Sequence, residues 1–371
     1  MLTLDDVALF RHFPGLRKKL AWVRLGHWPT PVQPLPGLPG VPVPVHVKRE
    51  DLSSPRYGGN KVRTLEAIMG LALETGARRI WATGALGSNH ATATALHAAH
   101  VGLEPALALF PQPETAVARA NLAAMLTAEP PCQPIRHAVE LPLVMARLRR
   151  REHSSYVMPP GGAIPRGTLG AMSAALELAE QVAAGECPPP SRIVLAVGST
   201  CTTAGLLVGV HLARALDIAF RAPSSPPRVT AVRVTPWPIT SAAMIARLAY
   251  QASRYVARLT GVAPPTLAQL RATLSVDRRF LGGGYGRPTL DGLRAQKAFR
   301  DSGGPPLDFV YSAKSGAALL DIARHHSSGP LLFWATKSSA PLPQPRPEQL
   351  VCAPEAWRRW LGPGYEWLAP A

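Results

Sequence analysis

Short apolar runs alternate with longer stretches of helical periodicity along the chain, and few folds accommodate this alternation. Short apolar runs bounded by glycine or proline indicate strands, and apolar positions three and four residues apart indicate helices. The predicted strands are 43–47, 79–83, 105–110, 192–197, 228–235, one ending at 309–311, and 331–336. The predicted helices are 61–76, 89–100, 114–126, 140–151, 168–184, 204–216, 240–259 and 315–325. Strands and helices at this spacing form βαβ units, so we predict an α/β fold with mainly parallel sheets.

The length of 371 residues is enough for two domains with separate cores. No apolar run reaches the roughly 18 residues of a membrane span, so no membrane partner is expected. The acidic start Met1–Asp6 has no secretion signal. The four cysteines are scattered without metal or disulfide spacing, which favours a reducing cytoplasm and no metal site. We expect the proline-rich residues 1–40 to wrap the surface.

The net charge of +17 raises the question of nucleic acid. Arginine is spread through the chain, and the densest basic cluster is Leu148–Arg151. Nucleic-acid binding needs a basic face interleaved with aromatic residues or a known motif, and neither is evident. We therefore attribute the charge mostly to compositional bias, with a weak attraction to anions, and predict no nucleic-acid partner.

One lysine stands where a helix begins. A turn containing Gly58 and Gly59 follows the strand 43–47, and a helix opens behind Asn60, which puts Lys61 in its first turn. The positive end of the helix dipole disfavours the charged amine and favours a nucleophilic neutral one. By spacing alone, an ordinary surface lysine in the first turn of a helix is the commoner interpretation.

Two polar turns also join a strand to a helix N-terminus, where free N–H groups suit an anion. The first contains Ser88, Asn89 and His90, and the second is 198–203. Neither is a Walker A loop or a dinucleotide fingerprint. By spacing alone each is also compatible with an ordinary capped helix.

Taken together, these segments resemble a known family. Gly58–Arg63, preceded by Lys48–Leu52, resembles the cofactor-lysine segment of the pyridoxal-phosphate enzymes of the tryptophan synthase β type (fold type II). The chain is most similar to the D-cysteine desulfhydrase and 1-aminocyclopropane-1-carboxylate (ACC) deaminase family, with separate motifs in the same order from about Leu25 to Arg324.

The resemblance implies two domains, each a mainly parallel sheet flanked by helices. The larger, cofactor-binding domain would be 1–63 plus 160–371 and the smaller 64–159, with the active site in the cleft between them. It also implies pyridoxal 5'-phosphate as cofactor, a small amino acid as substrate and a homodimer.

The resemblance also assigns roles to individual residues. Lys61 would hold the cofactor covalently, with Asn60 beside it. The cofactor phosphate would meet Gly198, Ser199, Thr200, Cys201, Thr202 and Thr203. Asn89 would meet its phenolic oxygen and Ser312 its pyridine nitrogen. Ser88 would bind the substrate carboxylate and take part in catalysis. The remaining substrate-facing residues would be Asn89, His90, and the catalytic tyrosines Tyr285 and Tyr311.

Two segments, 200–201 and 163–164, depart from the family pattern, and Ser312 distinguishes the chain from the ACC deaminases. Thr200 and Cys201 replace the usual glycines, which narrows backbone freedom. Ala163–Ile164 replaces Ser-Asn, so two polar groups are lost. Ser312 replaces the glutamate of the ACC deaminases, and we expect a hydroxyl there to leave the ring nitrogen largely neutral.

The sequence therefore predicts a pyridoxal-phosphate-dependent lyase in which Lys61 removes the α-proton. Loss of a β-substituent would lead to a keto acid and ammonia, and Tyr285 or Tyr311 would either protonate the leaving group or shape the pocket. Cyclopropane opening is disfavoured by Ser312. The alternatives are β-replacement or racemisation on the same cofactor, and a non-catalytic binding protein.

Overall fold

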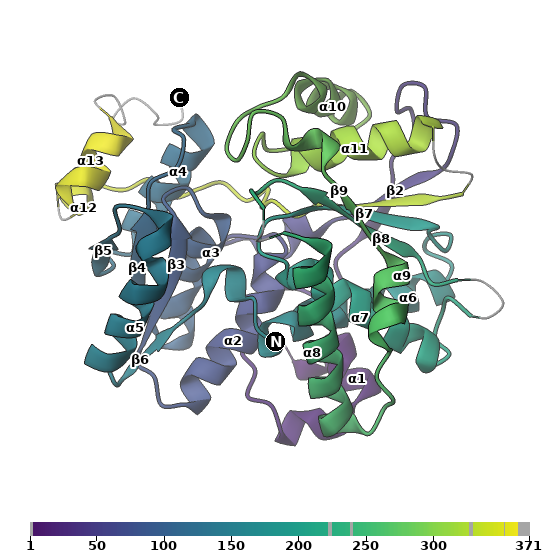
Figure 1. Cartoon of the computed structure of the whole chain (residues 1–371), viewed down its shortest axis with the longest axis horizontal. Coiled ribbons are helices and arrows are strands. Elements are labelled where there is room, and N and C mark those ends of the chain that lie inside the picture. Colours follow the sequence, from purple (N-terminus) through teal and green to yellow (C-terminus); the bar gives the residue numbers. More distant parts are fainter. Residues whose placement is uncertain (1–2, 222–224, 238–239, 326–328, 352, 363–371) are drawn as a thin grey trace.

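The computed structural model describes residues 3–221, 225–237, 240–325, 329–351 and 353–362. Two sheets lie side by side, one with six strands and one with four (Figure 1). Among the described strands, β1 and β2 pair antiparallel and all other pairs are parallel. The predicted α/β class with mainly parallel sheets is confirmed.

The six-stranded sheet has the order β1-β2-β10-β7-β8-β9. Its strands are β1 (Val32–Pro34), β2 (Val45–Lys48), β10 (Leu331–Trp334), β7 (Arg192–Val197), β8 (Arg228–Arg233) and β9 (Leu274–Asp277). One face is covered by α10 (Leu290–Asp301) and α11 (Ser312–His325). The other is covered by α6 (Leu169–Ala183), α7 (Cys201–Ala215), α8 (Ala242–Thr260) and α9 (Leu267–Thr273) (Figure 1).

The four-stranded sheet has the order β5-β4-β3-β6. Its strands are β5 (Cys132–Pro134), β4 (Glu104–Phe110), β3 (Arg79–Ala85) and β6 (Ser155–Val157). On one face α5 (Leu141–Arg151) closes a small core around Trp81 and Met145. The helices α3 (Asn89–Ala98) and α4 (Ala116–Leu126) pack together on the other side, with α3 against β3 and β4.

Helix α2 (Lys61–Glu74) connects the two halves, because it packs against both α6 and α3. Its backbone lies close to other segments. A Cβ on Gly70 would come within 2.3 Å of the carbonyl oxygen of Ala21, and one on Gly170 within 2.0 Å of that of Arg63. Since α2 is buried on both sides, the predicted domain boundary at residues 63 and 64 stays a prediction.

Several expectations about local structure were wrong. Residues 309–311 form a turn before α11 rather than a strand end. The N-terminal segment does not only wrap the surface, because Val7–Phe10, which enter helix α1 (Ala8–His12), are buried in the main core. The sequence also left out α9, β9 and α10, and gave no structure to α12 (Pro347–Val351) and α13 (Glu355–Leu361). Of the four cysteines, Cys352 lies outside the described residues.

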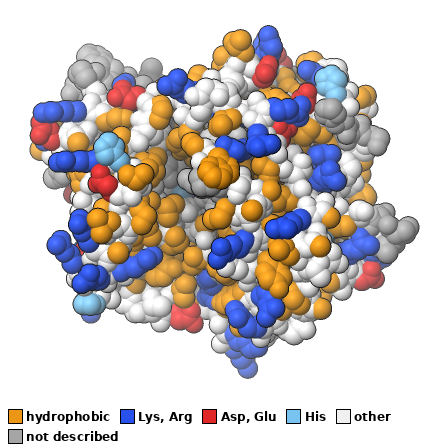
Figure 2. All heavy atoms as spheres, in the orientation of Figure 1, with side chains coloured by type: hydrophobic (Ala, Val, Ile, Leu, Met, Phe, Trp, Pro, Cys, Tyr) orange, Lys and Arg blue, Asp and Glu red, His pale blue; other side chains and the backbone are white. Residues whose placement is uncertain are grey.

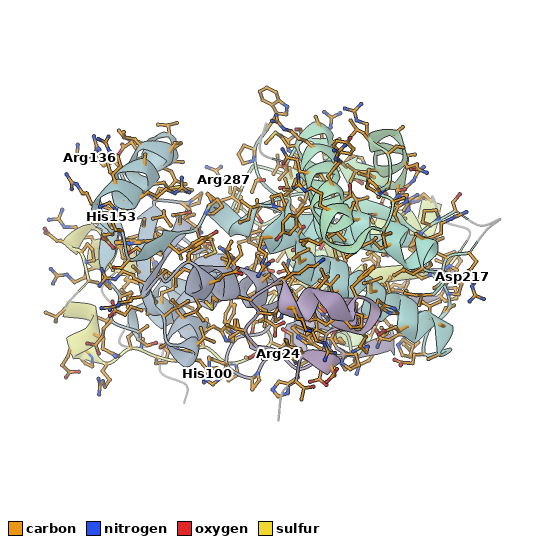
Figure 3. All side chains as sticks on the ribbon, turned by 90° about the horizontal axis from the view of Figure 1, so that it is seen from below. Arg24, His100, Arg136, His153, Asp217 and Arg287 are labelled. Carbon is orange, nitrogen blue, oxygen red and sulfur yellow. The ribbon has the colours of Figure 1, made fainter. Side chains whose placement is uncertain are left out.

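Charged side chains are dispersed over the face of the molecule that Figure 2 shows. On the face in Figure 2, lysine and arginine side chains are scattered rather than gathered in one patch. Figure 3 places Arg136 and His153 on the four-stranded half and Asp217 at the opposite end of the molecule. Within the described ranges, no helix combines the length and the apolarity needed to cross a bilayer.

Candidate active site

The segments singled out in the sequence meet at the carboxyl ends of β3, β7 and β10, next to the start of α2. Gly59 makes this close approach possible, since it has φ +90° and a Cβ there would lie 2.5 Å from the carbonyl oxygen of Thr336. The amide of Asn60 donates to that same oxygen at 3.2 Å. The Gly58–Gly59 turn therefore seats Lys61 beside the end of β10.

Lys61 is the first residue of α2 and is half-buried. Burial lowers the pKa of its amine from the ordinary value of 10.5, and an interaction with Cys201 works in the opposite direction. His90 also lies near Lys61, since the charge of Lys61 contributes to the lowered pKa of His90. The sequence predicted a shift toward the neutral amine, and the lowered pKa of Lys61 has that direction. Its main cause is burial rather than the helix dipole.

The segment 198–203 consists of a turn at 198–200 and the first three residues of α7, and it has the features of an anion site. Asn60 Nδ2 donates to Thr202 Oγ1 at 2.8 Å, which leaves the Thr202 hydroxyl proton free to donate. Thr203 Oγ1 is buried and has no hydrogen-bond partner among the described residues. A buried hydroxyl without a partner is rare and costly, and a bound phosphate would supply the missing acceptor.

The two departures in this turn behave differently. Thr200 has φ +63° and lies in the left-handed region, which costs a β-branched residue conformational energy that glycine avoids. The Sγ atom of Cys201 donates to the carbonyl oxygen of Gly162 at 3.2 Å. The Cys201 side chain is thus occupied inside the protein, and only its backbone is left to line the turn.

Ser88 caps α3, with its Oγ accepting from the amide of Ala91 at 3.3 Å. The hydroxyl proton and the first amides of α3 remain available to a carboxylate. His90 is buried against Met158, with Nε2 3.2 Å from the sulfur atom. Burial lowers the pKa of His90 to about 3, so it is neutral and offers a substrate carboxylate no charge.

Tyr285 and Tyr311 form a pair, with their hydroxyl oxygens 2.8 Å apart and the rings edge to face. A Cβ on Gly198 would lie 2.9 Å from the ring of Tyr311, so the pair lies against the 198–203 turn. Burial raises the pKa of Tyr285 to about 12 and that of Tyr311 well above 10. Both hydroxyls therefore keep their protons at neutral pH.

Ser312 is the first residue of α11 and is bonded on two sides to Asp308. Its Oγ donates to Asp308 Oδ2 at 2.7 Å and accepts from the Asp308 amide at 2.6 Å. The hydroxyl proton is committed to the carboxylate, so Ser312 offers a ring nitrogen a lone pair rather than a proton. From the sequence we expected a hydroxyl here to leave the ring nitrogen neutral, but an oxygen that only accepts favours a protonated nitrogen, so this geometry does not support the exclusion of ring opening.

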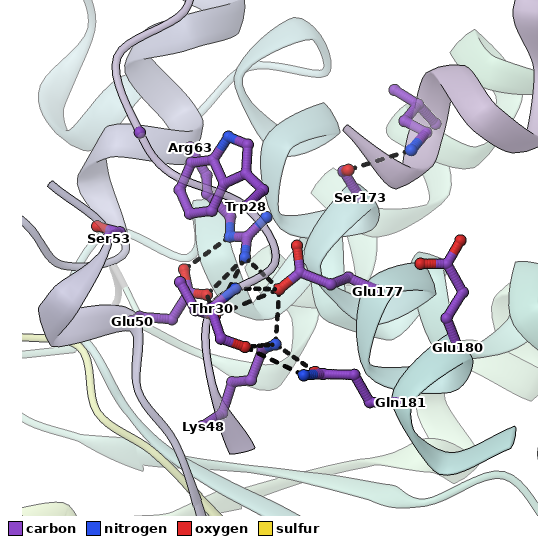
Figure 4. A network of polar contacts seen from close by, with 12 residues as sticks. Trp28, Thr30, Lys48, Glu50, Ser53, Arg63, Ser173, Glu177, Glu180 and Gln181 are labelled. Atoms are coloured by element: carbon purple, nitrogen blue, oxygen red, sulfur yellow. Dashed lines mark hydrogen bonds and ion pairs between the residues drawn. The ribbon is translucent and has the colours of Figure 1, made fainter. Parts of the chain in front are cut away.

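A buried network of charges includes Arg63, which lies in the first turn of α2 (Figure 4). Glu177 Oε1 accepts from Lys48 Nζ at 2.6 Å and from Arg63 Nη2 at 2.8 Å. Arg63 also binds both carboxylate oxygens of Glu50 at 2.7 Å. Burial alone would raise the pKa of Glu177, but Arg63 and Lys48 outweigh it and hold the pKa below 4.5.

Sequence reasoning missed three polar residues that surround Asn89. Tyr57, Asn121 and Lys337 each donate to Asn89 Oδ1, at 3.0, 2.8 and 3.0 Å. They come from a loop, from α4 and from the segment after β10, and none belongs to a local motif. Only the tertiary structure brings them together.

A half-buried lysine at a helix start, close to a hydroxyl-rich helix N-terminus between two mainly parallel sheets, fits an α/β enzyme that holds a phosphorylated aldehyde cofactor. The family model described as "Pyridoxal-phosphate dependent enzyme" matches residues 23–336. The chain belongs to this pyridoxal-phosphate-dependent family and has the fold of its type II enzymes.

Individual relatives agree with this assignment. The chain is 32% identical over 334 residues to a nocardicin C-9' epimerase from Nocardia uniformis subsp. tsuyamanensis, covering 87% of this chain and 95% of the relative. It is 31% identical over 318 residues to a D-cysteine desulfhydrase from Klebsiella pneumoniae subsp. pneumoniae, covering 82% and 90%. The crystal structure of an ACC deaminase homologue has a TM-score of 0.73 at 30% identity, covering 90% of this chain and 95% of that one.

The residues at the site fit pyridoxal phosphate. Lys61 supplies an amine with a lowered pKa, and the unpartnered hydroxyl of Thr203 supplies a donor where a phosphate would meet α7. The structure brings several predicted site residues together. Asn60, next to Lys61, contacts Thr202, and Tyr311 lies against Gly198. Asn89 accepts a hydrogen bond from Lys337, in the segment after β10.

Proposed function

We propose that this enzyme removes the α-proton of a small amino acid and eliminates a β-substituent, giving a keto acid and ammonia. The observation that carries the proposal is the half-buried Lys61 amine with its lowered pKa, at the start of α2 and beside the 198–203 turn. Bound pyridoxal phosphate supplies the electron sink for the charge left at Cα.

The 198–203 turn holds the cofactor phosphate through its amides and through the hydroxyls of Ser199, Thr202 and Thr203. Asn60 fixes the direction of the Thr202 hydroxyl by donating to its oxygen. Charge-assisted hydrogen bonds of this kind are the stronger ones in proteins. The substrate carboxylate is bound by the Ser88 hydroxyl and the first amides of α3, where the helix dipole favours an anion.

Proton transfer is divided between Lys61 and the tyrosine pair. A neutral Lys61 amine accepts the α-proton, which requires the lowered pKa that burial provides. One tyrosine hydroxyl donates to the other, which leaves one O–H of the pair free to donate to a leaving group. The raised pKa values keep these protons in place at neutral pH.

The experiment that tests the reaction compares two products. Purified protein loaded with pyridoxal phosphate is incubated with D- and L-alanines carrying a β-thiol, β-chloro or β-hydroxyl group, and separately with ACC. We expect pyruvate from at least one β-substituted alanine and a slower release, or none, of ketobutyrate from ACC. Faster release of ketobutyrate than of pyruvate from every β-substituted alanine would reject the proposal in favour of ring opening.

A second candidate is inversion at Cα without loss of a substituent. It is favoured by the similarity to the nocardicin C-9' epimerase at 32% identity. Chiral chromatography after incubation in deuterium oxide distinguishes the two reactions. Elimination gives pyruvate, whereas inversion gives the opposite enantiomer carrying deuterium at Cα. Addition of external thiols tests β-replacement in the same assay.

We also propose the division into 1–63 plus 160–371 and 64–159, with the active site at their junction, and a homodimer. Limited proteolysis tests the division and light scattering tests the dimer. A cytoplasmic location stays a prediction from the cysteine pattern.

A further inference from the structure

Lys337 lies at the centre of a polar cluster that joins separate parts of the chain. It follows β10, where the chain crosses from the six-stranded half toward α4 and the four-stranded half (Figure 1). Its Nζ atom is 2.9 Å from Tyr57 Oη, 3.0 Å from Asn89 Oδ1 and 3.2 Å from Asn121 Oδ1. None of the steps of the proposed reaction has used this lysine.

The donors of Lys337 decide how its neighbours are oriented. An ammonium group has three donors and no acceptor, so the atoms that face it are oxygens. Asn89 and Asn121 therefore both turn their amide oxygens toward Lys337. Asn121 Nδ2 consequently points the other way and donates to Asn89 Oδ1 at 2.8 Å and to the carbonyl oxygen of Gly87 at 2.9 Å.

Asn89 is left with its oxygen saturated and its nitrogen free. Three donors converge on Oδ1, from Tyr57, Asn121 and Lys337. Asn89 is only half-buried, and its Nδ2 has no partner among the described residues. The amide N–H groups are therefore held in one orientation and are available to an acceptor outside the cluster.

We propose that Lys337 is a positioning residue, which fixes the Asn89 amide so that its N–H groups meet the phenolic oxygen of the cofactor. The inference rests on the proposed function, and it takes Asn89 as the partner of that oxygen, as the family resemblance implies. The positive charge of Lys337 also polarises the Asn89 amide, which makes its N–H groups stronger donors. Lys337 does not act as a base here, because all three of its N–H groups are donated to oxygens.

The experiment is a double-mutant cycle on cofactor affinity, which needs no substrate. Apoprotein of the wild type, Lys337→Met, Asn89→Ala and the double variant is titrated with pyridoxal phosphate while the near-visible absorption is recorded. We expect Lys337→Met to weaken binding about tenfold in the wild-type background, as for the loss of one charged hydrogen bond. In the Asn89→Ala background the same change has an effect within about twofold, because the group that Lys337 positions is gone.

Two controls separate this role from a general loss of charge or stability. Lys297→Met removes a lysine from an exposed ion pair with Asp301 on α10 and leaves the affinity unchanged. Thermal unfolding of each apoprotein shows whether the variants fold. If Lys337→Met does not fold, Lys337→Gln replaces it in the cycle, since glutamine keeps an N–H donor without the charge.

Equal fold-changes in both backgrounds would overturn the inference, because Lys337 would then act independently of Asn89. No change in either background would overturn it as well. If the wild type binds pyridoxal phosphate at Lys61 and the cycle is additive, only the role of Lys337 is lost. If the wild type does not bind the cofactor at Lys61, the proposed function is lost with it.

Discussion

Replacement of Glu177 by glutamine should destabilise the protein strongly without touching the reacting groups. Glu177 is fully buried, and its Oε1 accepts from Lys48, Arg63 and the amide of Thr30 at 2.6, 2.8 and 2.9 Å. With Glu50, the cluster has two positive and two negative side chains, so its charges balance (Figure 4). The Glu177→Gln variant leaves one positive charge buried without compensation.

The expected loss follows from that imbalance. Removal of one partner from a buried ion pair costs about 3–5 kcal/mol in free energy of unfolding. A control lies three residues further along α6, where Glu180 pairs with Arg11 and with His12 nearer the surface. Because surface pairs contribute about 0–1 kcal/mol, Glu180→Gln should cost no more than that.

Urea unfolding of the apoproteins, followed by circular dichroism, measures both variants against the wild type. The low pKa of Glu177 adds a dependence on pH with a definite sign. Since folding lowers this pKa, the stabilisation is complete above the ordinary value of 4.5 and is lost as the pH falls below it. Equal effects of Glu177→Gln and Glu180→Gln at pH 7 would refute the reasoning that the buried network is held together by charge balance.

The remaining predictions concern the site itself. Thr202→Ala should weaken pyridoxal phosphate affinity by about one to two decades in a titration of the apoprotein, because one charge-assisted bond is lost; an unchanged affinity would place the phosphate elsewhere. Ser88→Ala should raise KM and lower kcat/KM in steady-state assays on an active β-substituted alanine, whereas unchanged kinetics would remove Ser88 from carboxylate binding. Folding lowers the pKa of His90 to about 3 and of His97 to about 4, so the unfolded chain binds protons that the native state does not. The contribution of these two histidines to the free energy of unfolding is therefore fully present above pH 6.5. Below that pH it is lost, by about 2 kcal/mol per histidine at pH 5. His97→Gln should make thermal midpoints less dependent on pH between 7 and 5, and an unaltered dependence would contradict this.

The local parts of the site could be predicted from the sequence because each depends on neighbouring residues. The Gly58–Gly59 turn places Lys61 at a helix start, and Ser88 caps α3 as a serine at a strand–helix turn commonly does. The sequence placed the turn before α7 at 198–203, but α7 already begins at Cys201; the constraint expected at Thr200 is present, because Thr200 adopts a positive φ.

The rest depends on contacts between distant segments. Nothing local marks Lys337 as the partner of Asn89, since they are 248 residues apart in the chain. The predicted strand end at 309–311 failed because Asp308 accepts from the amides of Val310 and Tyr311 and turns the chain into α11. The same carboxylate takes the Ser312 hydroxyl proton, a direction of donation that the residue type alone does not determine.

The most direct measurement is the location of the cofactor on the chain. Purified protein incubated with pyridoxal phosphate is reduced with borohydride, digested and examined by mass spectrometry, with Lys61→Ala as the control. We predict a near-visible absorption band before reduction, a single phosphopyridoxyl label on the peptide that contains Lys61, and neither in Lys61→Ala. A label on another lysine, or an unlabelled Lys61 peptide after complete reduction, would contradict the account.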